Sequence, residues 1–249
     1  MKNLLLTGAL LVSASLCYAQ SDSTKAAEST KAVKGNVTTE LNVNLFQGDL
    51  KLNNALQQIK VRYFIKEGLA LRIGFNFTSS KDNSDVSNPY GNSPYTYTNT
   101  SKTSTVSLNG GIEKHFKGTK RLSPYVGAEL SLANKSSSQE TSTGNSTLKV
   151  KGAWQTYTYN GNGLTATYSE RAYFKFGVNL VCGFDYYFAK NFYAGYEFLF
   201  QFNTTNYKDI DVTSTPTANQ PLTPTPRYDD SESFVGPSLI NGIRIGFIF

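Results

Sequence analysis

The chain has 249 residues, a formal net charge of +6, and 16 Tyr and 16 Phe among its aromatic residues. Its basic residues lie in a polar leader and in one short turn, or alternate with apolar residues, so they form no stripe of the kind that binds nucleic acid. One His and two Cys are too few for a disulfide scaffold and do not support a zinc site. We therefore expect no cofactor, no metal and no nucleic-acid partner.

The N-terminus has the parts of a secretory signal peptide: a basic start, an apolar run over residues 4–16 and small residues before a cut after Ala19. This run is shorter than the roughly 20 residues of a membrane-spanning helix. Leu16 stands before Cys17, where a lipoprotein signal normally carries a small residue. We expect three regions: a signal peptide over residues 1–19, a flexible periplasmic tether over 20–35, and one folded domain over 36–249.

From residue 36 the sequence alternates between apolar and polar residues with a period of two. In the first such segment Val37, Leu41 and Val43 share one face, while Glu40 and Asn42 share the other. This alternation is typical of a strand whose two faces meet different surroundings. Eight segments carry it: 36–45, 55–65, 69–77, 103–116, 124–132, 171–188, 192–202 and 239–249.

The connections between these segments alternate in length. Residues 66–68, 117–123 and 189–191 are short, whereas residues 79–101, 133–169 and 203–233 are long, polar and rich in Ser, Thr, Asn, Gly or Pro. The first loop on the side of the long connections, near residues 47–53, is shorter, so these three are numbered the second, third and fourth long loops. Short turns on one side and long loops on the other are typical of outer-membrane barrels. The sequence therefore predicts an all-β fold, an eight-stranded antiparallel transmembrane β-barrel with short periplasmic turns and long extracellular loops.

A soluble lipocalin-like barrel also has eight strands, but it buries its apolar face inside. Here the apolar face carries the larger residues, and the polar face mixes charges with glycines such as Gly74, Gly127 and Gly195. Small residues suit the narrow interior of an eight-stranded barrel. We therefore expect the apolar face to meet lipid and the polar face to line the lumen.

Each expected strand places a charged residue a few positions from its periplasmic end, and together these form a belt of four acids and four bases inside the barrel. The belt consists of Glu40, Lys60, Arg62, Arg72, Glu113, Glu129, Glu197 and Arg244. Such a belt could act as a gate or an ion path, or it could be a neutralised polar plug, since buried charges must be paired. The width of an eight-stranded lumen, just filled by its side chains, favours the structural plug.

Catalysis is not expected. The single histidine, His115, lies beside a periplasmic turn, whereas the known enzymatic barrels act near the outer rim, and no base for a nucleophile is supplied there. Cys182 belongs to the apolar face and is interpreted as a small lipid-facing hydrophobe. In the third long loop Trp154, Tyr157 and Tyr159 are candidates for recognition, because loops on a rigid scaffold often carry function.

Several short sequence segments resemble those of the small outer-membrane β-barrel family of Bacteroidetes-type bacteria, often described as porin-family proteins. They are Tyr63–Arg72, Pro124–Leu130, Gly183–Phe188, Tyr193–Glu197 and Gly246–Phe249. The resemblance implies a Gram-negative outer-membrane location and contact with lipopolysaccharide. Phe247 and Phe249 resemble the signal read by the barrel-assembly machinery, although Arg244 stands where that signal usually has Gly.

Three functions remain open at this point. The first is a structural or accessory barrel within an envelope assembly, in contact with other outer-membrane subunits. The second is a surface binder, adhesin-like, acting through the third and fourth long loops. The third is a narrow channel for small solutes.

Overall fold

The computed structural model describes residues 30–43, 56–90, 95–159, 161, 163–215, 230–239 and 243–249. The expected signal peptide and residues 20–29 of the expected tether lie outside this part of the chain. Within it, no helix is long and apolar enough to span a membrane.

Thirteen strands are described, and most belong to one sheet. Their bounds are β1 Val37–Val43, β2 Leu56–Lys66, β3 Leu69–Asn88, β4 Tyr95–His115, β5 Leu122–Thr143, β6 Ser146–Lys151, β7 Trp154–Tyr159, β8 Leu164–Ser169, β9 Tyr173–Ala189, β10 Phe192–Tyr207, β11 Asp211–Thr215, β12 Ser231–Leu239 and β13 Ile243–Ile248.

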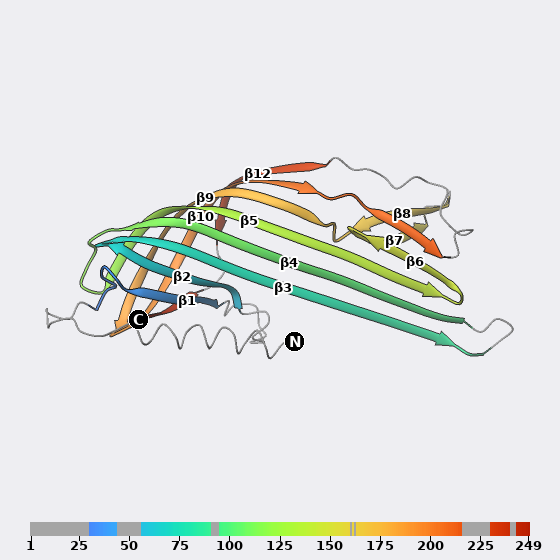
Figure 1. The fold of residues 1–249 in the computed structure, drawn as a ribbon, viewed down its shortest axis with the longest axis horizontal. Helices are drawn as coiled ribbons and strands as arrows, with labels where there is room; N and C mark the ends of the chain where they lie inside the picture. The colour runs from blue at the N-terminus through green and yellow to red at the C-terminus, as the bar shows by residue number, and fades with distance from the viewer. Residues whose placement is uncertain are drawn as a thin grey trace.

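The large sheet closes on itself. Neighbouring strands pair antiparallel from β1 through β2, β3, β4, β5, β9 and β10, and β13 pairs with both β10 and β1. Because β12 pairs with the upper part of β10 and β13 with its lower part, these two strands together occupy the eighth position of the ring. The ring of eight antiparallel strands is thus confirmed (Figure 1). The eighth strand was expected to run without interruption over 239–249, whereas β12 and β13 are separated by residues outside the described part.

The directions of the side chains in the ring follow the alternating pattern of the sequence. Large apolar side chains point outward all round the barrel, with exposed fractions of 42% at Leu41, 59% at Ile73, 51% at Leu180 and 43% at Phe198. The polar residues between them point inward and are buried. This is the reverse of a soluble barrel, which hides its apolar face, and it matches a wall surrounded by lipid.

Two of the short connections are tight turns of the expected length. Gly68 ends the β2–β3 turn with a φ of +65°, a conformation that L side chains rarely adopt, and a Cβ there would lie 2.8 Å from the carbonyl oxygen of His115. Asn191 has a φ of +71° in the β9–β10 turn. The C-terminus lies at this end of the barrel beside β1 (Figure 1), where the Phe249 amide donates to the Val37 carbonyl.

At the opposite end the expected strand boundaries are wrong, because the strands continue far into the segments taken as loops. β3 and β4 pair along their whole length, from Leu69 with Lys114 up to Asn88 with Tyr95. β5 reaches Thr143, and β6 pairs with both β5 and β11. The result is a sheet that extends well beyond the ring, on the side away from the short turns (Figure 1). We call this extension the raised sheet and this end of the molecule the upper end.

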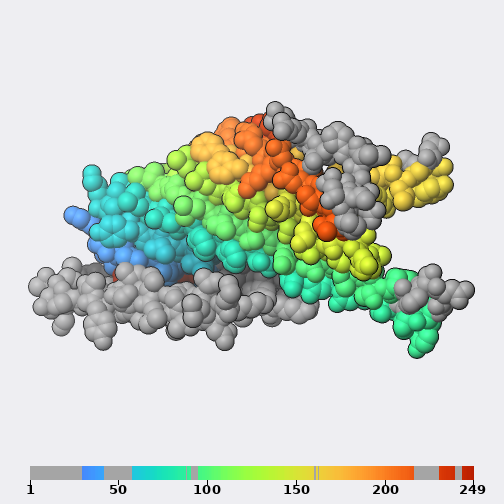
Figure 2. Space-filling model, turned by 45° about the vertical axis from the view of Figure 1, so that its right-hand side comes forward, coloured from blue at the N-terminus to red at the C-terminus, as the bar shows by residue number. Residues whose placement is uncertain are grey.

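The third long loop also contains a separate hairpin, in which β7 pairs with β8. In the space-filling view this hairpin, in yellow, and the β3–β4 tip, in green, project from the same end of the molecule (Figure 2). The hairpin is joined to the raised sheet by a small core in which Val150, Ala153 and Ile210 are at most 1% exposed, with Tyr168 packed against them. The upper end of the protein is therefore folded and has its own apolar core.

Candidate functional site: the charged lumen

The lumen contains the eight charged residues of the belt that the sequence placed there. All are at most 5% exposed, and they come from seven of the eight positions of the ring: Glu40, Lys60, Arg62, Arg72, Glu113, Glu129, Glu197 and Arg244. Strand alternation explains their shared direction, since each occupies an inward position between two outward residues, most of which are apolar.

Asp185 is a ninth member that the sequence analysis missed, and it is fully buried. The signal for it was available: Gly183 lies between the apolar residues Cys182 and Phe184, so it belongs to the inward face of the strand, and a residue two positions further must face the same way. With Asp185 included, five carboxylates face one lysine and three arginines among the described residues of the lumen.

The arginines of the belt each bridge several carboxylates from different strands. Arg62 lies 2.8 Å from both Glu113 and Asp185 and 3.4 Å from Glu40. The side chain also stacks over the ring of Tyr193, with 5.0 Å from Cζ to the ring centroid. Because these contacts cross the lumen, they tie together strands that are not neighbours in the sheet.

Arg72 occupies the middle of the network. It lies 3.0 Å from Glu113, 3.0 Å from Glu129 and 2.8 Å from Glu197. Among the described residues it is the only cation within ion-pair distance of Glu129, whose other polar contact is the side-chain amide of Asn179 at 3.0 Å. The charge of Glu129 is therefore balanced by one residue.

Arg244 and Lys60 complete the network on the side where the ring closes. Arg244 pairs with Glu40 at 3.0 Å, Asp185 at 2.9 Å and Glu197 at 3.5 Å. Lys60 lies 3.1 Å from Glu40 and 3.0 Å from Glu197. Residues on neighbouring strands therefore pair as Glu40 with Arg62 and with Arg244, Arg72 with Glu113, and Arg244 with Glu197.

Aromatic residues fill the lumen around and below the charges. The Tyr125 hydroxyl donates to Glu197 at 2.7 Å and the Tyr193 hydroxyl to Glu40 at 3.1 Å. Tyr193 packs against Tyr187, with 5.5 Å between their ring centroids, and all three tyrosines are at most 1% exposed. Large residues were expected mainly on the outer face, so this inner aromatic group was not predicted.

His115 lies in the lumen, 7% exposed, with Nδ1 3.0 Å from the Ser123 hydroxyl and Nε2 3.0 Å from Glu113. This Ser–His–Glu order resembles the arrangement of a hydrolase, in which a base activates a hydroxyl nucleophile. Ser123 is only 4% exposed, and Glu113 is engaged by two arginines. A substrate therefore has no open face of the hydroxyl to approach, and the trio is best explained as part of the buried network.

Inward glycines make room for these side chains. A Cβ on Gly183 would lie 2.6 Å from the Tyr125 hydroxyl, and one on Gly195 would lie 2.7 Å from both Arg244 and Asp185. A Cβ on Gly246 would collide with the ring of Tyr193. The glycines of the polar face are thus spatial requirements of the filled lumen.

Residues 30–35, assigned by the sequence to a flexible tether, contact the barrel at its short-turn end. The Lys31 amine donates to the Lys117 carbonyl at 2.6 Å, and the Gly35 amide donates to the Phe64 carbonyl. Partial burial lowers the pKa of the Lys31 amine. Ala32 packs against the cluster of Tyr187, Tyr193 and Ile248. This part of the segment is held by hydrogen bonds and apolar contact, which composition alone did not indicate.

The other candidate residues lie far from the belt. Trp154, Tyr157 and Tyr159 are all in β7 of the upper hairpin; Trp154 donates to the Lys102 carbonyl, while Tyr157 and Tyr159 are 54% and 70% exposed. Phe247 and Phe249 lie beside each other at the closing edge, with ring centroids 4.8 Å apart. Cys182 is exposed on the outer wall.

Comparisons with known proteins gave one family match and one similar solved structure. The model of the OmpA-OmpF-like porin family matches residues 44–214, more than half of the chain. No curated protein matches. The N-terminal β-barrel domain of Pseudomonas aeruginosa OprF, a solved structure, is similar at 17% identity, with a TM-score of 0.35 over 87% of this chain and 98% of that one. On the family match, the chain belongs to the OmpA-OmpF-like porin family and is an outer-membrane β-barrel protein.

Proposed function

We propose that this barrel is closed by its own charged side chains and serves as a structural or accessory subunit of an envelope assembly. The observation that carries the proposal is the network of nine buried charged residues that crosses the lumen from strand to strand. An ion in transit would have to separate paired charges that have little access to water, and leaving such a charge unpaired is costly. An eight-stranded ring offers no spare width beside them.

A flux assay tests the closed lumen. The purified full chain is reconstituted into lipid vesicles loaded with solute, and swelling is followed after transfer to small sugars or amino acids of increasing size. We expect swelling at the rate of vesicles without protein. Swelling that slows as the solute grows larger would favour the third function, a narrow channel, over the plug.

The accessory role has a separate test. Pull-down of the tagged full chain from cells in a gentle detergent should recover other outer-membrane subunits in fixed ratio. As a matched control, the same tag on an unrelated eight-stranded barrel should not recover them. Recovery of the chain alone at every detergent concentration argues against the accessory role while leaving the closed lumen intact.

A surface-binding function is the second candidate, and the folded upper end supports it. The β7–β8 hairpin stands on an apolar core and presents Tyr157, Tyr159 and Leu164, which is 71% exposed. Exposed aromatic residues on a rigid support are typical of binding surfaces. Cells carrying Tyr157→Ser together with Tyr159→Ser should lose adhesion without losing the protein from the membrane, whereas unchanged adhesion would leave this function without support.

The closing edge supports a further proposal on partners. Phe247 and Phe249 are the last aromatic residues of the final strand, and we propose that the barrel-assembly machinery reads them. Lipopolysaccharide is the proposed neighbour of the outer half of the barrel wall. The exported state requires a signal, for which residues 1–19 are the proposed segment.

A further inference from the structure

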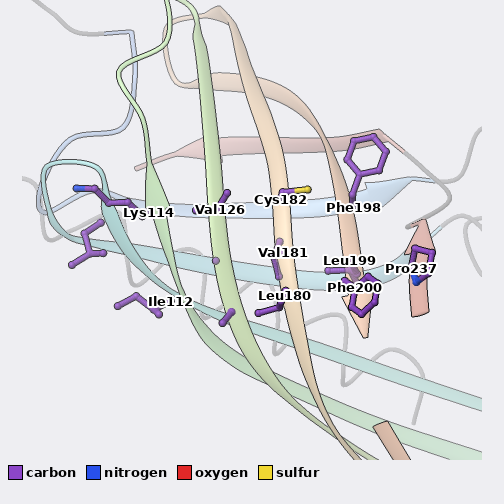
Figure 3. A pocket seen from close by; sticks show the side chains of 13 residues that line it. Ile112, Lys114, Val126, Leu180, Val181, Cys182, Phe198, Leu199, Phe200 and Pro237 are labelled. Atoms are coloured by element: carbon purple, nitrogen blue, oxygen red, sulfur yellow. The ribbon is translucent and has the colours of Figure 1, made fainter. Parts of the chain in front are cut away.

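The outer wall of the barrel is not uniform, because it carries a depression of about 740 Å³ across β3, β4, β5, β9, β10 and β12. Its lining includes the short side chains of Val126, Ala128 and Cys182. Phe198 and Phe200 stand at one side of it (Figure 3). Its volume lies within the range of about 300–1,000 Å³ found for small-molecule pockets. The wall thus offers an apolar groove in a surface that otherwise carries large side chains.

Strand register shows that the groove faces lipid. Val126 and Ala128 alternate with the buried lumen residues Tyr125 and Glu129. Across the sheet, Lys114 pairs with Val126, Val126 with Cys182, and Cys182 with Phe198. Residues paired in this way lie on one face of a sheet. They form a continuous outward row that starts at a lysine.

The same row climbs from the periplasmic surface into the bilayer. Lys114 is one residue from the end of β4 at His115, whereas Cys182 is seven residues from the end of β9 at Ala189. Neighbouring strands lie about 4.8 Å apart, so the three steps from Lys114 to Phe198 span roughly 14 Å across the sheet. Because barrel strands tilt by about 35–45°, roughly 8–10 Å of this span is rise through the membrane. The groove therefore has one end at the lipid headgroups and the other within the hydrocarbon.

Positive charge surrounds the lower end of the groove. Lys114 is exposed, and exposed Lys117, Lys120 and Arg121 occupy the β4–β5 turn directly below it. Glu67 lies in the neighbouring turn, yet none of the described carboxylates lies within ion-pair distance of Lys114 or Arg121. Lysine and arginine at this depth extend their charged ends toward the headgroups while their stems remain among apolar atoms.

We propose that the groove binds one anionic glycerophospholipid of the periplasmic leaflet, with an acyl chain along Val126, Ala128 and Cys182 and the phosphate at Lys114. Charge and position select this occupant together. Lipopolysaccharide phosphates lie at the other surface of the membrane, and an apolar segment of another protein would not use Lys114 and the three cations of the turn below it. The inference does not depend on the closed lumen, because the groove is on the opposite face of the same strands.

Native mass spectrometry of the full chain in mild detergent tests the proposal, with phosphatidylglycerol and phosphatidylcholine of equal chain length as probes. We expect one phosphatidylglycerol retained per chain in preference to phosphatidylcholine. Removing one cation near a membrane surface lowers such binding about fivefold, so Lys114→Gln should weaken phosphatidylglycerol by that factor and leave phosphatidylcholine unchanged. Lys81→Gln, at an exposed position on the raised part of β3, is the matched control and should change neither lipid.

Filling the groove separates specific binding from adsorption to a basic surface. Ala128→Phe should reduce retention of both lipids, because the added ring occupies the path of the acyl chain; Val126→Phe serves in its place if that variant does not fold, as judged by heat-dependent gel mobility. Equal retention of the two lipids by the unmodified chain overturns the proposal. So does unchanged retention in Lys114→Gln or in the groove-filling variant, and the latter result would assign the bound lipid to the basic turn alone.

Discussion

Removing single arginines from the lumen should destabilise the barrel in an order set by what each removal leaves behind. In Arg62→Met, every former partner keeps another cation: Glu113 keeps Arg72 at 3.0 Å, Asp185 keeps Arg244 at 2.9 Å, and Glu40 keeps Arg244 and Lys60. Breaking a buried pair costs about 3–5 kcal/mol. We expect Arg62→Met to reduce the free energy of unfolding by an amount near the lower limit of this range, about 3 kcal/mol.

Arg72→Met should cost more, toward about 5 kcal/mol, because it leaves the buried carboxylate of Glu129 with the Asn179 amide as its remaining polar contact. Adding Glu129→Gln to Arg72→Met should recover part of the loss, since a neutral amide is cheaper to bury than an unpaired charge. Lys81→Met, an exposed control on β3, should change stability by no more than about 0.5 kcal/mol.

Urea-dependent unfolding in phospholipid vesicles measures these differences by linear extrapolation. Far-ultraviolet circular dichroism and heat-dependent gel mobility are suitable signals. Fluorescence of the single tryptophan is not, because Trp154 lies in the upper hairpin rather than in the barrel. If Arg72→Met and Arg62→Met both behave like Lys81→Met, or if Glu129→Gln does not rescue Arg72→Met, the buried ion pairs do not stabilise the barrel as argued.

Three further predictions address other parts of the structure. Gly246→Ala should destabilise the barrel by about 1–3 kcal/mol because its Cβ meets the Tyr193 ring. The control Gly110→Ala, with nothing within 4 Å of its Cβ, should fold as well as the unmodified chain. Equal heat-dependent mobility of the two variants would contradict the filled lumen. Deleting Phe249 should lower the yield of assembled barrel in cells, and an unchanged yield removes the role proposed for the final aromatic residue. Ile210→Asp places a charge in the upper core and should expose the β7–β8 hairpin to protease while the barrel keeps its gel mobility. The control Val86→Asp, at a position 47% exposed, should leave the hairpin resistant to protease. Equal cleavage of both variants would argue against a folded upper end.

The membrane-embedded half of the fold could be predicted from the sequence because lipid and lumen impose opposite demands on alternate residues. At Leu71 and Arg72 the two demands are visible side by side, and the structure buries the arginine and exposes the leucine. Above the membrane both faces of a strand meet water, so consecutive residues such as Lys81 and Asp82 are both polar and no apolar alternation is seen, although they lie within β3. The pattern disappears there while the backbone pairing continues, and the strand ends could not be found from it.

The residues that form the belt were easier to predict from the sequence than the contacts between them. Strand parity locates the inward charges, and extended consistently from Gly183 it would also have located Asp185. It does not determine which partner each charge meets, because the stagger of strands round the ring decides whether Arg72 reaches Glu129 or Glu197. The inner tyrosines were missed for a related reason. Tyrosine is a residue type common at membrane interfaces, and the inward direction of Tyr193 becomes clear only from its pairing with Gly246.

Single-channel conductance in a planar lipid bilayer tests the central claim most directly. With the purified full chain at low concentration and both voltage polarities applied, the account predicts no steps above those of the protein-free membrane, because Arg62, Arg72, Arg244 and their carboxylates fill the lumen. Steady channels whose size does not change with protein concentration, recorded from folded monomer, would contradict it.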